Sequence, residues 1–80
     1  MDFDKISLDL NNKNIIAYID NKSNSFKKFG PEFIGRLVGR TIIKCDNISQ
    51  TVISLTILTH EYLTYKIPCE DISQITEILI

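Results

Sequence analysis

Residues 41–67 read TIIKCDNISQTVISLTILTHEYLTYKI, and this stretch decides the fold class. From position 41 to position 80, 17 of the 40 residues are Ile, Thr or Val. These β-branched side chains are stiff at χ1 and suit the pleated, half-buried surface of a sheet. The second half of the chain is therefore predicted to consist mainly of β-strands.

Loop lengths set the register of the three strands predicted in this stretch. A five-residue loop aligns Ile43 with Ile53, and a three-residue turn at 60–62 aligns Ile57 with Tyr65. Both choices oppose apolar residues to one another, whereas an even-length turn would oppose apolar to polar positions. The face expected to be buried consists of Ile43, Cys45, Ile53, Leu55, Ile57, Leu63, Tyr65 and Ile67.

The N-terminal segment is predicted to form a β-hairpin. Ile6, Leu8 and Leu10 alternate with polar residues, as in a strand with one buried face. Turn-forming residues follow at 11–14, and residues 15–20 form a second extended run. The four-residue loop places apolar residues opposite one another on one face, which supports the hairpin.

One short helix is expected over residues 31–39, after an exposed, polar loop at 21–30. Pro31 suits a first helical turn, where its missing N–H is not needed. Gly35 and Gly39 could let this helix lie close to the sheet. The spacing of one helical face is found at Phe33, Ile34, Leu37 and Val38.

The C-terminal residues are predicted to complete the sheet. Pro68 ends the third strand of the meander, residues 70–73 form a single turn, and residues 75–80 form a last strand. This last strand ends with apolar residues on both faces, so it is either central in the sheet or paired with another copy of the chain. Residues 1–80 are thus predicted to be a single α+β domain with a strongly bent antiparallel sheet or small barrel, and a homo-oligomer.

Composition also favours some classes of protein over others. No apolar run approaches the roughly 18 residues that span a bilayer. Asp2 and Asp4 stand where a secretory signal would carry positive charge, so a soluble, cytoplasmic protein is expected. Cys45 and Cys69 are too few for a disulfide framework or a cysteine metal site, and both are expected to be buried and reduced.

Catalysis, metal binding and a cofactor are not expected. His60 is the only histidine and lies in a predicted turn, so its expected role is that of an exposed polar residue. The three glycines lack the spacing and the Lys-Ser/Thr ending of a phosphate-binding loop. The protein is therefore predicted to bind rather than to catalyse.

Charge along the chain points to a possible ligand. Residues 22–44 contain six basic residues and one acidic residue, whereas the segments before and after are acidic and the net charge is −1. Two lysines stand between two phenylalanines just before the predicted helix, whose N-terminus favours an anion. Basic residues beside aromatic rings suit a nucleic acid or a nucleotide. The candidate ligand-binding residues are Phe26, Lys27, Lys28, Phe29, Arg36, Arg40 and Lys44.

Three alternatives stay open at this point. The basic segment could bind an acidic partner protein instead of a nucleic acid. Phe26 and Phe29 could instead close the edge of the core, with the neighbouring charges on a solvated surface. The protein could also be a phage-type inhibitor or adaptor, similar in role to an anti-CRISPR protein, because its composition is rich in Ile, Asn and Lys. Such an inhibitor would dock on a partner protein through an acidic face made of Asp46, Glu61, Glu70, Asp71 and Glu77.

Part of the chain resembles a known family. The predicted helix followed by LVGRTII at 37–43, and Ile67-Pro68 leading to Ile72 and Ile75, are similar to elements of Sm-like small barrels, which share an SH3-like architecture. The resemblance covers residues 33–78 and implies a curled antiparallel sheet and a ring or dimer. The family's bend glycine and its RNA-pocket signatures have no counterpart here, so the resemblance assigns no RNA-binding residue.

Overall fold

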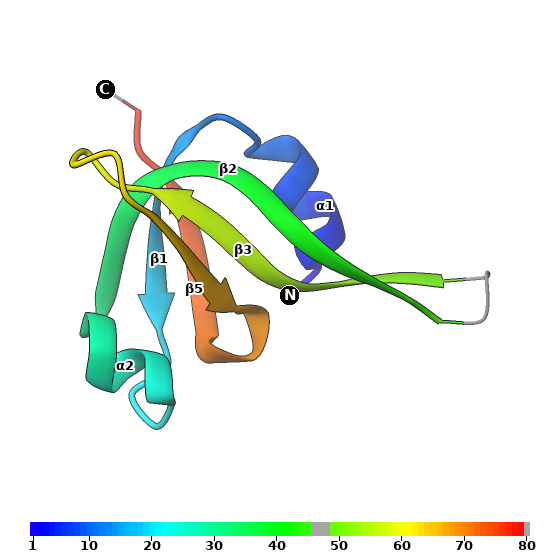
Figure 1. The fold of residues 1–80 in the computed structure, drawn as a ribbon, viewed down its shortest axis with the longest axis horizontal. Coiled ribbons are helices and arrows are strands. Elements are labelled where there is room, and N and C mark those ends of the chain that lie inside the picture. Colours follow the sequence, from blue (N-terminus) through cyan, green and yellow to red (C-terminus); the bar gives the residue numbers. More distant parts are fainter. Residues whose placement is uncertain (46–48, 80) are drawn as a thin grey trace.

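The computed structural model describes residues 1–45 and 49–79, which form a five-stranded antiparallel sheet with two short helices (Figure 1). The strand order is β4-β3-β2-β1-β5, with β2 at the centre. This confirms the predicted α+β class and antiparallel sheet. In chain order the elements are α1 (Phe3–Asp9), β1 (Asn14–Ile19), α2 (Asn24–Phe29), β2 (Glu32–Cys45), β3 (Ser49–Leu58), β4 (Thr64–Pro68), the 3-10 turn η1 (Cys69–Asp71) and β5 (Ile72–Glu77).

The predicted N-terminal hairpin is wrong, because its first strand is the helix α1. The side chain of Asp2 accepts a hydrogen bond from the backbone N–H of Lys5 at 3.2 Å and thereby caps the helix. Phe3 and Leu10 pack against the core, whereas Leu8 is 62% exposed. Phe3, Ile6 and Leu10 are the partly buried apolar residues of this segment, and their spacing of three and four residues is that of one helical face.

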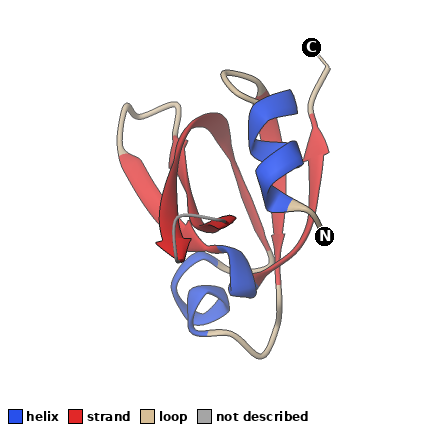
Figure 2. Cartoon of the chain, turned by 90° about the vertical axis from the view of Figure 1, so that its right-hand side faces the viewer, coloured by secondary structure: helices blue, strands red, loops and turns tan. Residues whose placement is uncertain are grey.

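The predicted loop at 21–30 and helix at 31–39 are also wrong, since the helix comes first and the strand follows. Ser23 caps α2 by accepting a hydrogen bond from the backbone N–H of Phe26, and Gly30 ends the helix with a φ of 81°. The next 14 residues form β2, which pairs with β1 on one side and β3 on the other. Figure 2 shows α1 and α2 at different ends of the sheet.

The register predicted for β2 and β3 is wrong by two residues. Ile43 pairs with Thr51, not with Ile53, and Ile53 lies at an irregularity of the ladder. Ile43 and Ile53 are 47% and 39% exposed, so both were wrongly assigned to the core. The loop expected at 46–50 lies largely outside the described residues, and so does the side chain of Cys45.

The register predicted for β3 and β4 is confirmed. Ile57 pairs with Tyr65 and Leu55 with Ile67, as the three-residue turn required. Leu55, Ile57 and Ile67 are fully buried, whereas Leu63 is 51% exposed and was wrongly placed in the core. The buried cluster consists of Ile15, Ala17, Ile19, Leu37, Val52, Leu55, Ile57, Ile67, Cys69 and Ile72.

The last strand lies at an edge of the sheet, which contradicts the first of its two predicted alternatives, a central position, whereas pairing with another copy of the chain stays a prediction. β5 begins at Ile72, earlier than predicted, after the single turn η1 where a turn was expected. Glu77 pairs with the core residue Ile15, and the ladder between β1 and β5 is irregular beside Tyr18. A charge on the core-facing side and a bulge both discourage a further strand from pairing with an edge. Ile80 lies outside the described residues.

Gly35 marks the closest approach between β2 and β3. A Cβ atom built on Gly35 would lie 2.5 Å from Ile57 Cγ2 and 2.6 Å from the carbonyl oxygen of Leu58. At Gly39 the nearest atom, Thr56 Cβ, would lie at an ordinary distance of 3.6 Å. A side-chain Cβ atom therefore fits at Gly39 but not at Gly35.

We expect Gly35→Ala to lower the free energy of unfolding by about 2–3 kcal/mol, because the backbone of β3 cannot yield without disturbing the core. Gly39→Ala is the matched control and should change it by less than about 0.5 kcal/mol, or stabilise the strand slightly. Urea denaturation of both variants measures the difference. Equal effects would show that the close approach at Gly35 is not a constraint.

Candidate functional site

Four of the seven predicted ligand-binding residues lie on α2. Phe26 and Phe29 are partly buried and pack against the core, in agreement with the alternative that they close its edge. Lys27 and Lys28 are exposed, and Lys28 Nζ lies 5.1 Å from the centroid of the Phe29 ring. Of this group, only the lysines present charge to a ligand.

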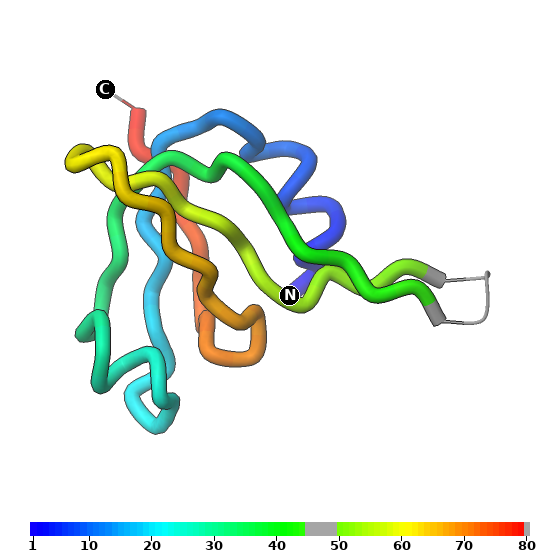
Figure 3. Tube along the Cα trace, viewed as in Figure 1, coloured from blue at the N-terminus to red at the C-terminus, as the bar shows by residue number. Residues whose placement is uncertain are grey.

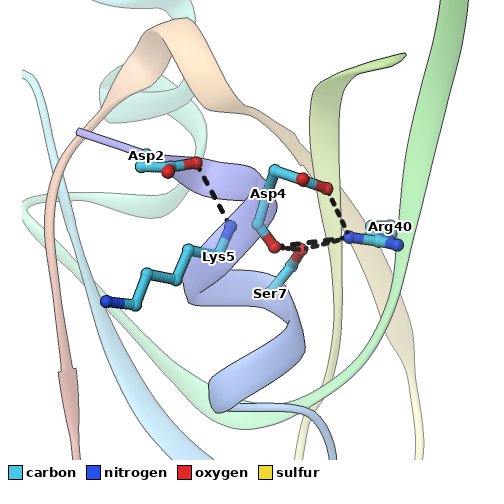
Figure 4. A network of polar contacts seen from close by, with 5 residues as sticks. All are labelled: Asp2, Asp4, Lys5, Ser7 and Arg40. Atoms are coloured by element: carbon cyan, nitrogen blue, oxygen red, sulfur yellow. Dashed lines mark hydrogen bonds and ion pairs between the residues drawn. The ribbon is translucent and has the colours of Figure 1, made fainter. Parts of the chain in front are cut away.

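The other three, Arg36, Arg40 and Lys44, are spread along β2. Arg40 Nη1 donates to Asp4 Oδ1 at 3.0 Å and to Ser7 Oγ at 2.9 Å, which ties β2 to α1 (Figure 4). Lys44 lies near the end of β2, opposite Gln50 of β3. This end of the β2–β3 ribbon extends away from α2 (Figure 3). The structure therefore does not gather the predicted residues into one basic surface.

Arg36 lies in a hollow that the sequence did not reveal. The hollow has a volume of about 500 Å³ and occupies the sheet face away from the core, where β3 turns towards β4. Register places Arg36 beside Asn14 of β1 and Leu58 of β3. Within the described residues Arg36 makes no ion pair, so its guanidinium can bind a ligand. The lining residues are Asn14, Ile34, Gly35, Arg36, Leu58, Thr59, His60, Tyr62 and Ile78.

A second hollow, of about 350 Å³, lies on the other side of the same turn. Its aromatic wall consists of Phe29, Phe33 and Tyr65, whose ring centroids are 4.8–5.5 Å apart in edge-to-face arrangement. Lys28 and Glu61 place opposite charges on the lining, and Leu63 adds an exposed apolar side chain. Thr59 lines both hollows, so they flank one β3–β4 turn.

Tyr62 lines the first hollow and is the most exposed aromatic residue of the described chain. It is 85% exposed and has a φ of 63°, a left-handed conformation that costs a bulky side chain about 1–2 kcal/mol. The backbone N–H of Tyr62 donates to the carbonyl of Thr59 at 3.0 Å, which fixes the turn. The sequence carried a signal for this residue, since a three-residue turn without Gly or Asn must place another side chain at positive φ. We call Tyr62 and the two hollows the turn site.

The side chains of the turn site supply charged, aromatic and apolar contacts. No group of three or more potential metal-ligating side chains occurs in residues 1–45 and 49–79. Burial raises the pKa of the Cys69 thiol to about 11, so this cysteine is protonated and a weak nucleophile at neutral pH. His60 is exposed, with its Nε2 atom 3.9 Å from Glu61 Oε1. The site offers a ligand Arg36 and the exposed Tyr62 ring in the first hollow, and Lys28 in the second.

Comparisons of the chain with protein-family models, curated proteins and solved structures give no match. In the described part of the chain, no helix is long and apolar enough to cross a membrane. The function of the turn site is therefore inferred from its geometry and charge.

We expect Tyr62→Gly to raise the free energy of unfolding by about 1 kcal/mol, because glycine adopts a positive φ without steric cost. Tyr62→Ala is the matched control, since it removes the ring but keeps the strained backbone, and it should not stabilise the fold. Urea denaturation of both variants measures the two effects. A loss of stability in both would mean that the ring supports the fold rather than a ligand.

Proposed function

We propose that the protein is a non-enzymatic binding module that captures an anionic ligand, a nucleic acid or a nucleotide, at the turn site. The observation that carries this proposal is the exposed, strained Tyr62, which lines one hollow together with Arg36, a cation that forms no ion pair in the described structure. Lys28, a second such cation, lines the hollow on the other side of the turn. A ring held outside the core at a cost in backbone strain suggests a role in binding.

The proposed contacts follow from the chemistry of the side chains. Every nucleobase has a π-face, and stacking a base on an aromatic side chain contributes about 1–3 kcal/mol. Arg36 offers a planar fork of donors to a phosphate, and the Asn14 amide beside it can donate or accept a hydrogen bond. Ile34, which is 57% exposed, provides an apolar wall next to them. Tyr62 would thus hold the base while Arg36 neutralises the phosphate.

The inhibitor alternative has less support. Glu61 lies at the β3–β4 turn, whereas Glu70 and Asp71 lie at the other end of β4, in η1. Asp71 Oδ2 accepts a hydrogen bond from Ser25 Oγ at 2.5 Å, so this carboxylate already has a partner. Glu77 is partly buried on β5, and Asp46 lies outside the described residues. The acidic residues are therefore dispersed, which weakens the case for one acidic docking face.

The finer features of the fold are part of the same proposal. A central β2 shared by both halves of the sheet, with a 3-10 turn between β4 and β5, supports an SH3-like small barrel that is open between its edge strands. The buried, unpaired Cys69 supports a reducing, cytoplasmic location. Assembly into a homo-oligomer stays a prediction.

The salt dependence of binding tests the proposed function. We expect a fluorescent single-stranded oligonucleotide to bind with an affinity that falls linearly with salt on a log–log scale. Arg36→Ala and Lys28→Ala should each weaken binding and lower the slope by about 0.7, because each removes one phosphate contact. Fluorescence anisotropy over a salt series gives both quantities.

Lys44→Ala is the matched control for these variants. It removes an exposed cation of the same charge, far from the turn site, and should leave the slope unchanged. Binding that ignores salt, or that responds to Lys44→Ala as strongly as to Arg36→Ala, contradicts the proposed site.

Glu61→Gln separates the two candidate functions. Glu61 is the acidic residue lining the second hollow, so its neutralisation should tighten the binding of an anion by about two- to fivefold, as for a partly exposed charge pair. The inhibitor alternative predicts weaker binding to its partner, because Glu61 belongs to its acidic face. The same anisotropy assay, at one low salt concentration, measures the change.

A further inference from the structure

We infer that the ligand of the turn site is a single nucleic-acid strand that crosses the β3–β4 turn with one base on each side of it, and that a free nucleotide fills only half of the site. This inference rests on the proposed function and chooses between its two ligands. The observation behind it is that a cation and aromatic side chains occur on each side of the β3–β4 turn.

Each hollow has its own cation and its own aromatic wall. The first has Arg36 and the ring of Tyr62, and the second has Lys28 and the cluster that includes Tyr65. Their volumes of about 500 and 350 Å³ lie within the range of small-ligand sites, about 300–1,000 Å³. A mononucleotide in one hollow would leave the other cation and the other rings without a ligand.

The position of the hollows fits a continuous chain. On β2, Ile34 and Arg36 point away from the core, whereas Phe33 is on the core side. Tyr65 of β4 is also on the core side. The two hollows therefore lie on opposite faces of the sheet, separated by the end of one hairpin. Thr59 lines both hollows, so a strand that reaches both faces has to pass only over the turn at 60–62.

The turn itself presents little obstacle to such a path. The side chains of His60 and Glu61 are 92% and 69% exposed, and Tyr62 is 85% exposed, so none of them closes the space above the turn. A duplex could not follow the path, because its bases are stacked and paired and cannot enter two separate hollows. The geometry therefore selects an unpaired strand.

The length dependence of binding tests this inference. The probes are thymidine 5′-monophosphate, the tetranucleotide dT4 and a dT8·dA8 duplex, each measured by calorimetry at low salt with the full chain. We expect dT4 to bind at least about fivefold more tightly than the monophosphate, since a second stacked base contributes a factor of about 5–150. The duplex should bind more weakly than dT8 alone.

Variants on the two sides of the turn show whether both hollows are used. Arg36→Ala should weaken the monophosphate and dT4 alike, whereas Lys28→Ala should remove most of the extra affinity of dT4 and leave the monophosphate unchanged. Lys27→Ala is the matched control, because Lys27 is an exposed neighbour on α2 that lines neither hollow. Circular dichroism and urea midpoints establish that each variant is folded.

The outcomes separate the inference from the proposed function. Equal affinity for dT4 and the monophosphate, or a gain that survives Lys28→Ala, overturns the two-hollow path while the anion site around Arg36 stands. A duplex that binds as tightly as dT8 also overturns it. If neither the monophosphate nor dT4 binds at low salt, the proposed function itself fails, and the inference with it.

Discussion

The close approach of β2 to β3 at Gly35 is the constraint on which the rest of the structure depends. Because a Cβ atom on Gly35 would collide with the Ile57 side chain and the Leu58 carbonyl, the two strands can meet here only if this position lacks a side chain. The contact sets Arg36 beside Leu58, and the pairing of β2 with β1 then sets Arg36 beside Asn14. One missing side chain thus positions both the central strand and the first hollow of the turn site.

The turn between β3 and β4 shows how backbone stability and the proposed binding role compete. The three-residue connection keeps Leu55 and Ile57 in register with the apolar residues of β4, and this register buries the core. The same connection forces Tyr62 into a left-handed conformation outside the core. A glycine would suit this backbone conformation better. The proposed stacking of a base gives the tyrosine ring a role at this position.

Charge that is segregated along the sequence is redistributed in space. Arg40 belongs to the basic stretch, yet it is neutralised by Asp4 from the acidic N-terminal segment. Lys44 lies near the far end of β2, opposite Gln50. Of the predicted cations, Lys28 and Arg36 line the two hollows that flank the β3–β4 turn. Charge counted along the chain predicts an anionic ligand, but pairing between distant elements decides which cations are left without an acidic partner.

The sequence by itself determined the β-rich class, the three-residue turn and the burial of Leu55, Ile57 and Ile67, because β-branching and alternation act over a few neighbouring residues. It did not determine that residues 3–9 are helical or that residues 32–45 form the central strand. Short apolar runs fit both a helical and an extended period. For residues 32–45, the neighbouring strands β1 and β3 supply the hydrogen bonds that select the extended form. Only the tertiary structure could place two hollows on either side of the β3–β4 turn. Their walls come from α2, from the four strands β1 to β4, from the turn itself and from Ile78, which follows β5.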